Sequence, residues 1–149
     1  MKELYEYGNM HANGRPYCAL FEAVGHYEVM PDTPERIAEA VRKALLELDG
    51  VIINGGTGIA ARDSTIEAVR PLIDKELEGF GELFRALSFQ EIGSAAFLSR
   101  ALAGIGGGKI IVALPGSPSA CRLALERLLL PELGHMAHLL GLAPHGHRD

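Results

Sequence analysis

Two glycine-rich segments stand where the chain could hold an anionic ligand. Residues 55–58 (GGTG) follow the apolar run 51–53, and residues 115–117 (PGS) follow the apolar run 109–114. Each segment also precedes a stretch with helical character. At the edge of a parallel sheet, where strands end and helices begin, free backbone N–H groups can bind a phosphate, and glycine lets the ligand approach closely. The pair predicts a phosphate-binding site, although either segment alone would be explained as a tight turn.

Two aspartates are placed to face that site. Asp63 precedes Ser64, and Ser64 with Glu67 fits a capping box, in which each side chain bonds the other residue's backbone N–H. Asp32 precedes Thr33, whose hydroxyl can cap the following helix. If the hydroxyls serve as caps, both aspartate carboxylates are left over for a ligand. Each aspartate alone is more typical of an ordinary surface acid.

Carboxylates beside a phosphate repel it unless a divalent cation lies between them. Mg²⁺ prefers one or two carboxylates together with substrate phosphates. The sequence therefore predicts magnesium-nucleotide chemistry, with Asp32 and Asp63 as the metal ligands. Arg62 could contact a phosphate, although a solvated arginine in a turn is the more common case.

Several other chemistries lack support in the sequence. There is no G-x-x-x-x-G-K-[ST] segment and no G-x-G-x-x-G between a strand and a helix, which argues against the common nucleotide-binding folds. Residues 104–108 (GIGGG) precede an apolar run and are expected to form a flexible connection. His135 and His138 have no third ligand for zinc. Ser99 and Ser117 lack the G-x-S-x-G setting of a nucleophile.

Composition limits the class of protein. The 149 residues suit one domain over 1–149. Hydrophobic residues make up 48% of the chain, yet no apolar run reaches the roughly 18 residues of a membrane span, so the surplus suggests an oligomer. The formal charge of −5 without a basic cluster argues against nucleic acid or a membrane as partner. Cys18 and Cys121 have no zinc or redox spacing, which favours reduced thiols in the cytoplasm.

The elements that would position the site follow from local patterns. Residues 1–14 show no periodicity and are expected to form an arm or loop, and residues 15–24 a short helix. Residues 26–30 resemble a short strand. Thr33-Pro34-Glu35 combines a hydroxyl cap, a first-turn proline and an acid at the positive dipole end, so it predicts a helix start. The apolar stripe that follows at helical spacing comprises Ile37, Ala40, Val41, Ala44, Leu45 and Leu48.

The rest of the chain alternates further between helix and strand. After an Asp49-Gly50 turn, residues 51–53 form an aliphatic β-branched run, as in strands buried on both faces of a parallel sheet. A tail is expected over 141–149. The alternation predicts an α/β sandwich. Helices are expected over 64–77, 80–87, 94–103 and 119–130, a second buried strand over 109–114, and inward side chains at Ile66, Val69, Ile73 and Leu77.

Three groups of residues resemble a known family. Gly55-Gly56-Thr57-Gly58 with Arg62-Asp63, Thr65 and Glu67 resembles the signature of the molybdenum cofactor biosynthesis proteins of the MoaB/MogA type. Residues 79–82 (GFGE) with 87–93 (LSFQEIG), and 114–117 (LPGS) with 120–122 (ACR), resemble the MoaB branch in particular. Three separated motifs in the right order are specific, whereas G-G-T-G alone is weak. The resemblance covers about residues 25–140.

The resemblance implies a three-layer α/β sandwich with a mostly parallel central sheet, assembled as a trimer or hexamer. It also implies binding of molybdopterin and transfer of an adenylyl group to it from Mg-ATP, in which the terminal phosphate of molybdopterin attacks the α-phosphate of ATP. Asp63 and Asp32 match the family's two essential acids and would bind Mg²⁺. The expected ligand contacts are Gly55, Gly56, Thr57, Gly58, Arg62, Thr65, Pro115, Gly116 and Ser117.

Two departures from the family pattern and two other functions stay open. The family begins with an apolar strand in the middle of the sheet, and no residue before Arg15 resembles it, so the first strand is expected to be missing or atypical. Ile66 replaces a usual proline, at little cost. The alternative functions are a non-catalytic oligomeric carrier of a pterin or nucleotide, and an assembly subunit.

Overall fold

The protein folds into one sheet covered on both faces by helices. The computed structural model describes residues 4–8 and 26–142, with side chains from Glu28 onward. Within these residues the sheet has six strands in the order β2-β1-β3-β6-β5-β4. β2, β1, β3 and β6 run parallel, whereas β5 and β4 join antiparallel. The strand bounds are β1 Leu4–Gly8, β2 His26–Glu28, β3 Gly50–Asn54, β4 Lys75–Glu76, β5 Leu102–Gly106 and β6 Lys109–Leu114.

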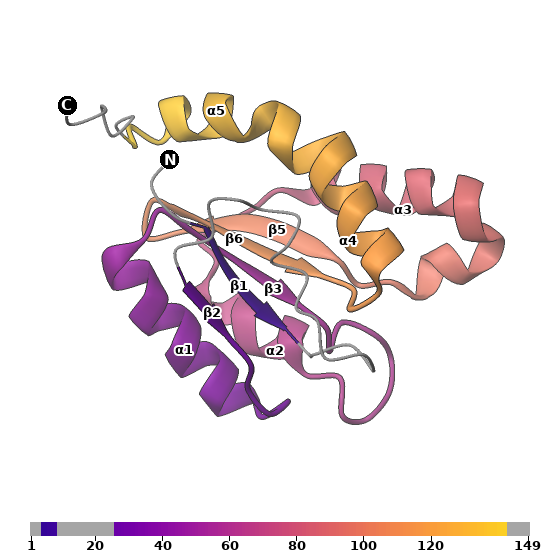
Figure 1. The fold of residues 1–149 in the computed structure, drawn as a ribbon, viewed down its shortest axis with the longest axis horizontal. Helices are drawn as coiled ribbons and strands as arrows, with labels where there is room; N and C mark the ends of the chain where they lie inside the picture. Colours follow the sequence, from indigo (N-terminus) through magenta and orange to yellow (C-terminus); the bar gives the residue numbers. More distant parts are fainter. Residues whose placement is uncertain (1–3, 9–25, 143–149) are drawn as a thin grey trace.

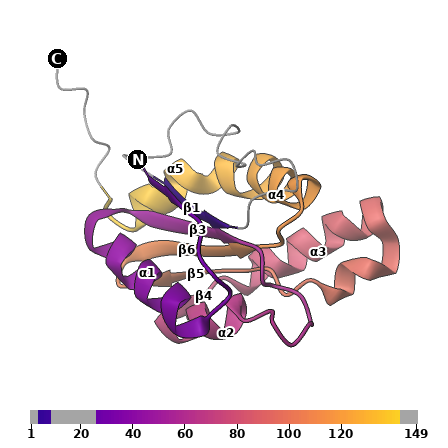
Figure 2. The same ribbon diagram turned by 60° about the horizontal axis from the view of Figure 1, so that its bottom comes forward.

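Helices form one layer on each side of the sheet (Figure 1). α1 and α2 cover the face on which Val51 and Ile53 are buried. α3, α4 and α5 cover the other face, where Ile52 is buried (Figure 2). The predicted three-layer α/β sandwich with a mostly parallel sheet is confirmed. The helix bounds are α1 Pro34–Glu47, α2 Thr65–Val69, α3 Glu78–Ile92, α4 Pro118–Ala124 and α5 Leu130–Leu139.

The first strand, which the sequence suggested was missing, is present as β1. It pairs in parallel with β3, from Leu4 opposite Gly50 to Gly8 opposite Asn54, and with β2 along its other side. It therefore lies inside the sheet, and the prediction of an arm or loop was wrong for this segment. Two tyrosines flank a glutamate here, so β1 lacks the aliphatic run that marks β3, and pairing on both sides decides its structure. The helix expected over 15–24 lies outside the described residues, as do 9–14 and 143–149.

α1 begins where the sequence predicted. Thr33 occupies the N-cap position and Pro34 the first turn, and the apolar face is buried at Ile37 and Val41. The Thr33 hydroxyl makes no capping bond, however, so that part of the prediction was wrong. The Thr33 N–H instead donates to Pro31 O at 2.7 Å, and this backbone turn leads the chain into the helix.

The helix expected over 64–77 is much shorter. α2 ends at Val69, a 3₁₀ turn follows, and β4 begins at Lys75. Pro71 explains the early end, because it has no N–H to continue the helical hydrogen bonds. Leu77, expected to face inward, is partly exposed and donates its N–H to a carbonyl of β5 instead.

The helix expected over 94–103 is also wrong. A 3₁₀ segment spans Gly93–Leu98, and the chain then enters β5, antiparallel to β6. Alanine and leucine in this stretch favour helix locally. The pairing with β6 prevails because it buries Ala101 and Ala103 against Phe84 of α3.

The glycine segment 104–108 divides between strand and turn. Gly104 and Gly106 lie in β5, whereas Gly107 and Gly108 form the hairpin turn to β6, both with positive φ. A Cβ on Gly104 would lie 2.5 Å from the Ile73 side chain, so the strand needs glycine there. The predicted connection is therefore correct only for the last two glycines.

β6 matches the strand predicted over 109–114, and α3 contains the helix predicted over 80–87. The helix predicted over 119–130 begins at Pro118 and continues through a π-helical turn, Leu125–Leu129, into α5. Among residues 26–142, no helix is long and apolar enough to cross a membrane. Because β3 and β6 are adjacent and parallel, the loops that follow them lie at the same edge of the sheet.

Candidate functional site

The two glycine-rich loops meet at the carboxyl ends of β3 and β6. The Gly55 N–H donates to Leu114 O at 2.9 Å, and a Cβ on Gly116 would lie 3.3 Å from Gly55 Cα. Gly55 and Gly56 have positive φ values of 96° and 64°, a region that L side chains rarely adopt. Both the turn and the close approach therefore depend on glycine, and they bring the two loops together as the sequence predicted.

A cavity of about 730 Å³ opens between the two loops, and we call it the glycine-loop cavity. Asp32 and Asp63 both line it, so the structure brings the two predicted acids to one place. The expected ligand residues also line it, except Thr65 and Ser117. Leu98 and Ser99, which follow α3, complete the wall and were not predicted.

Thr65 supports the first loop from outside the cavity. Its hydroxyl donates to Gly55 O at 2.8 Å, and its N–H donates to Gly56 O at 3.0 Å. The side chain is 2% exposed, and a Cβ on Gly56 would collide with Thr65 Oγ1. Ser117 has a similar structural task in the second loop, where its hydroxyl accepts the N–H of Ala120 at 3.3 Å and caps α4.

The first loop leaves three successive backbone donors unused. Within the described part of the chain, the N–H groups of Gly56, Thr57 and Gly58 make no hydrogen bond. All three residues line the glycine-loop cavity. Backbone N–H groups are strong donors that need a partner when water is excluded, and successive donors in a turn form an anion-binding concavity. The loop can therefore accept a phosphate without breaking an existing bond.

The two aspartates are held differently. Asp63 Oδ2 accepts the N–H of Ala60 at 2.9 Å, which fixes this carboxylate. The Asp32 carboxylate makes no hydrogen bond to any described residue. Its Oδ1 lies 3.5 Å from the position that a Cβ on Gly56 would take, and is thus beside the first loop. The cavity therefore has one carboxylate held by a hydrogen bond, that of Asp63, and one whose two oxygens make no such bond to the described chain, that of Asp32.

The capping box predicted at the start of α2 is wrong. The Ser64 hydroxyl makes no capping bond and donates instead to Asp32 O at 3.1 Å. The Glu67 carboxylate pairs with Arg100. Ser64 thus ties the segment before α1 to the start of α2, and this tertiary contact, invisible to a local pattern, helps to bring the two aspartates together.

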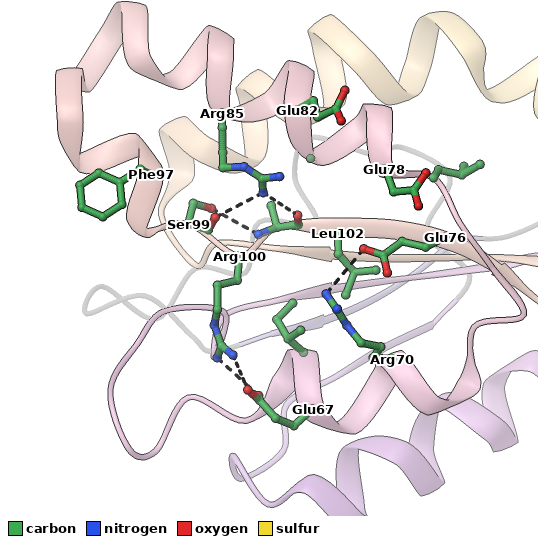
Figure 3. A pocket seen from close by; sticks show the side chains of 14 residues that line it. Glu67, Arg70, Glu76, Glu78, Glu82, Arg85, Phe97, Ser99, Arg100 and Leu102 are labelled. Carbon is green, nitrogen blue, oxygen red and sulfur yellow. Dashed lines mark hydrogen bonds and ion pairs between the residues drawn. The ribbon is translucent and has the colours of Figure 1, made fainter.

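Arg100, which contacts the first loop from behind, is a further residue that the sequence analysis missed. Its Nε donates to Gly58 O at 2.9 Å and to Thr57 O at 3.3 Å, and its Nη2 donates to Asp63 O at 3.3 Å. Nη1 and Nη2 also contact the Glu67 carboxylate (Figure 3), and this bond lowers the pKa of Glu67. A lone arginine gives no local signal of such a role, because its partners lie 33 to 43 positions away in the sequence.

The buried amide side chain of Asn54 links the end of β3 to the second loop through Cys121. Asn54, the last residue of β3, is 4% exposed, and its Nδ2 lies 3.8 Å from Cys121 Sγ. The thiol of Cys121 donates to Pro115 O at 3.2 Å. Asn54 Oδ1 is the one buried side-chain N or O atom, among those described, that has no hydrogen-bond partner. Cys121 is buried, whereas Cys18 lies outside the described residues, so the reduced state expected for both thiols stays a prediction.

Comparison with known proteins decides the family. A family described as a probable molybdopterin binding domain matches residues 19–135. The chain is 51% identical over 124 residues to the molybdenum cofactor biosynthesis protein B of Halalkalibacterium halodurans, which is 78% of this chain and 73% of that protein. The chain belongs to the MoaB/MogA family of molybdenum cofactor biosynthesis proteins.

Solved structures of MoaB proteins share the whole fold. A crystal structure of a molybdenum cofactor biosynthesis protein B superposes with a TM-score of 0.85 at 41% identity and covers 95% of both chains. The molybdopterin biosynthesis enzyme MoaB of Thermus thermophilus gives a TM-score of 0.81 at 34% identity, over 97% of this chain and 99% of the other. The family resemblance drawn from the three motifs is confirmed.

The type and number of acidic side chains in this MoaB/MogA-family site suit Mg²⁺. The cavity offers two carboxylates, Asp32 and Asp63, which is the number that Mg²⁺ takes alongside substrate phosphates. Of the residues described, no three His, Cys, Asp or Glu side chains are placed to hold a metal by themselves. Arg62 is exposed at the wall of the cavity, where its guanidinium can reach a phosphate of a bound ligand.

Proposed function

We propose that this protein binds molybdopterin and transfers an adenylyl group to it from Mg-ATP. The glycine-loop cavity carries the proposal, because residues 56–58, whose N–H groups are unused by the described chain, line it together with Asp32 and Asp63. Bringing two phosphorylated ligands together requires anion donors and a cation between phosphates and acids. Relatives named for molybdenum cofactor biosynthesis support the same pathway for this chain.

Different residues of the chain position the phosphates and the metal ion. The N–H groups of residues 56–58 bind phosphate oxygens, and Arg62 adds a cationic contact at the wall. Asp63, which Ala60 already holds in place, and Asp32 are the ligands for Mg²⁺. Bound there, Mg²⁺ offsets the negative charge of the phosphates during transfer.

The reaction joins two phosphate groups. An oxygen of the terminal phosphate of molybdopterin attacks the α-phosphorus of ATP, and the bond from that phosphorus to the oxygen bridging to the β-phosphate breaks. The electron pair leaves with pyrophosphate. No covalent bond to the protein is needed, so the chain acts by holding both anions in line. The second loop, with Pro115 and Gly116, supplies the opposite wall for this alignment.

A homo-oligomer, trimer or hexamer, is part of the proposal, as is a cytoplasmic location. Large apolar side chains on α3 and the segment after it are exposed: Leu83, Phe89, Ile92 and Phe97, the last by 75%. An apolar surface of this kind is typical of a subunit interface. Light scattering of the purified protein measures the oligomeric state directly.

Pyrophosphate release from Mg-ATP in the presence of purified molybdopterin tests the transfer. Asp63→Asn removes a negative charge while it keeps the shape of the side chain, so release should fall by about 100-fold or more. Asp74→Asn is the matched control, because Asp74 accepts the N–H of Gly107 in the β5–β6 hairpin, outside the cavity. This control should release pyrophosphate at the wild-type rate.

Other outcomes select the alternative functions. A wild-type chain that binds molybdopterin without releasing pyrophosphate would be a non-catalytic carrier. A chain that binds neither molybdopterin nor ATP would retain only the assembly role. Equal release by wild type and Asp63→Asn would remove Asp63 from the metal site.

A further inference from the structure

Arg100 lies behind the first glycine loop and not in the glycine-loop cavity. It lines a neighbouring cavity of about 720 Å³ bordered by α2, α3 and β5 (Figure 3), and it is absent from the wall of the glycine-loop cavity. Its hydrogen bonds reach the carbonyl side of the loop at Thr57, Gly58 and Asp63. Apart from its charge, Arg100 can therefore influence a ligand in the glycine-loop cavity only through the loop backbone.

Planar trans peptides connect the guanidinium to the donors on the loop. In a trans peptide, the carbonyl of one residue and the N–H of the next point in opposite directions, and the described residues contain no cis peptide. Arg100 Nε holds Thr57 O, so the N–H of Gly58 points away from the guanidinium. Gly58 lines the glycine-loop cavity, and its N–H makes no hydrogen bond to any described residue.

We propose that Arg100 is a positioning residue that turns the Gly58 N–H toward a phosphate in the glycine-loop cavity. The identity of that phosphate rests on the proposed function, but the orientation of the peptide does not. Gly58 has no Cβ to restrict the Thr57–Gly58 peptide plane from its side, and the bond from Arg100 to Thr57 O is an external contact that fixes this plane. A planar guanidinium can bridge several acceptors at fixed angles, whereas the ammonium of a lysine cannot.

Glu67 holds the guanidinium in the required orientation. Its carboxylate contacts Nη1 and Nη2 of Arg100, while Nε and Nη2 reach the loop carbonyls. Arg70 provides a matched comparison in the same neighbouring cavity. It pairs with Glu76 at 3.5 Å and makes no hydrogen bond to the glycine loop among the described residues.

The experiment compares full-length wild type with Arg100→Gln, Arg100→Lys and Arg70→Gln. Selective ¹⁵N-glycine labelling reports the Gly58 amide resonance of the free protein, and pyrophosphate release reports KM for Mg-ATP and kcat. Both Arg100 variants should shift the Gly58 resonance and raise KM about tenfold, the effect of misplacing one hydrogen bond to a charged ligand, with a smaller change in kcat. Arg70→Gln should change neither quantity.

The lysine variant separates positioning from simple charge. If Arg100→Lys keeps the wild-type Gly58 resonance and KM, charge alone suffices and the proposal is overturned. An unchanged Gly58 resonance in Arg100→Gln overturns it as well. If Arg100→Gln does not fold, Arg100→Lys, which keeps a cation beside Glu67, decides the question. A wild-type chain without pyrophosphate release would remove the proposed function alone, because the Gly58 comparison is made on the free protein.

Discussion

The loop after β3 and the hairpin turn between β5 and β6 are both glycine-rich, but their surroundings differ. A Cβ on Gly56 would collide with Thr65, and one on Gly58 would lie 2.7 Å from Asp63 Oδ2. A Cβ on Gly107 or Gly108 would meet nothing within 4 Å. The glycines of the loop are required by close contacts, whereas those of the hairpin are required only by the backbone turn.

The two regions also differ in whether their backbone N–H groups are hydrogen-bonded. The Gly107 N–H is bonded to Asp74 Oδ2 at 2.8 Å, while the donors of residues 56–58 make no hydrogen bond to the described chain. Glycine content therefore marks a turn in both places. Unused donors at the carboxyl end of a parallel strand distinguish the place where a ligand can bind.

Replacing one glycine in each region should give the largest difference between them. Gly56→Ala puts a side chain at φ 64° and against Thr65, so it should lower the free energy of unfolding by about 3 kcal/mol and abolish pyrophosphate release. Gly107→Ala, at φ 57° in open space, should cost about 1 kcal/mol and leave release unchanged. Urea unfolding and the release assay measure both. Equal losses in the two variants would show that positive φ alone matters.

Removing the contact that anchors each region should give a smaller effect. Thr65→Val keeps the side-chain volume but leaves the buried Gly55 O without its donor, so the free energy of unfolding should fall by about 1–3 kcal/mol, and KM for Mg-ATP should rise. Asp74→Ala removes an exposed bond to Gly107 and should cost about 0.5 kcal/mol, without any change in KM. An unaltered KM in Thr65→Val would contradict an anchoring role for Thr65.

The smallest expected effect is on the free energy of unfolding at acid pH, and it comes from the Arg100–Glu67 ion pair behind the first loop. The pKa of Glu67 lies below its usual value of 4.5 in the folded protein because of the bond to Arg100. The pair therefore contributes stability above the unfolded pKa, and this is lost as the pH falls through the lowered folded pKa. The contribution should stay under about 1 kcal/mol, since the Glu67 side chain is more than half exposed to solvent.

Urea unfolding of wild type and Glu67→Gln across the acid range measures this contribution. The wild type should be the more stable protein at neutral pH, and the difference should shrink as the pH is lowered from about 5 to about 2. A difference that does not depend on pH would mean that the charge of Glu67 is not involved.

Sequence patterns predicted those parts of the fold that are specified locally. The aliphatic runs of β3 and β6 identified two buried parallel strands, and Pro34 marked the start of α1. The two glycine loops lie close together because β3 and β6 are neighbouring parallel strands, which end at one edge of the sheet. Asp32 and Asp63 were assigned to the site because the hydroxyl residue after each was expected to cap a helix; neither hydroxyl does so, yet both aspartates line one cavity.

The parts that were missed depend on partners distant in the sequence. β5 looks helical because alanine favours helix, and only its pairing with β6 makes it a strand. Ser64 and Glu67 fit a capping box by spacing, but Asp32 O and Arg100 provide better-placed partners in the folded chain. Arg100 itself acts across more than thirty positions, a separation at which a single sequence carries no information.

The position of β1 also constrains the order of events during synthesis. Leu4 pairs with Gly50, so β1 leaves the ribosome and waits for a partner translated 46 positions later. Its other edge pairs with β2, which is translated between β1 and β3. Closing such separated parallel pairs is slow compared with local helix formation. A chain stalled before β3 would leave one edge of β1 unpaired, and such an edge can pair with another chain and aggregate.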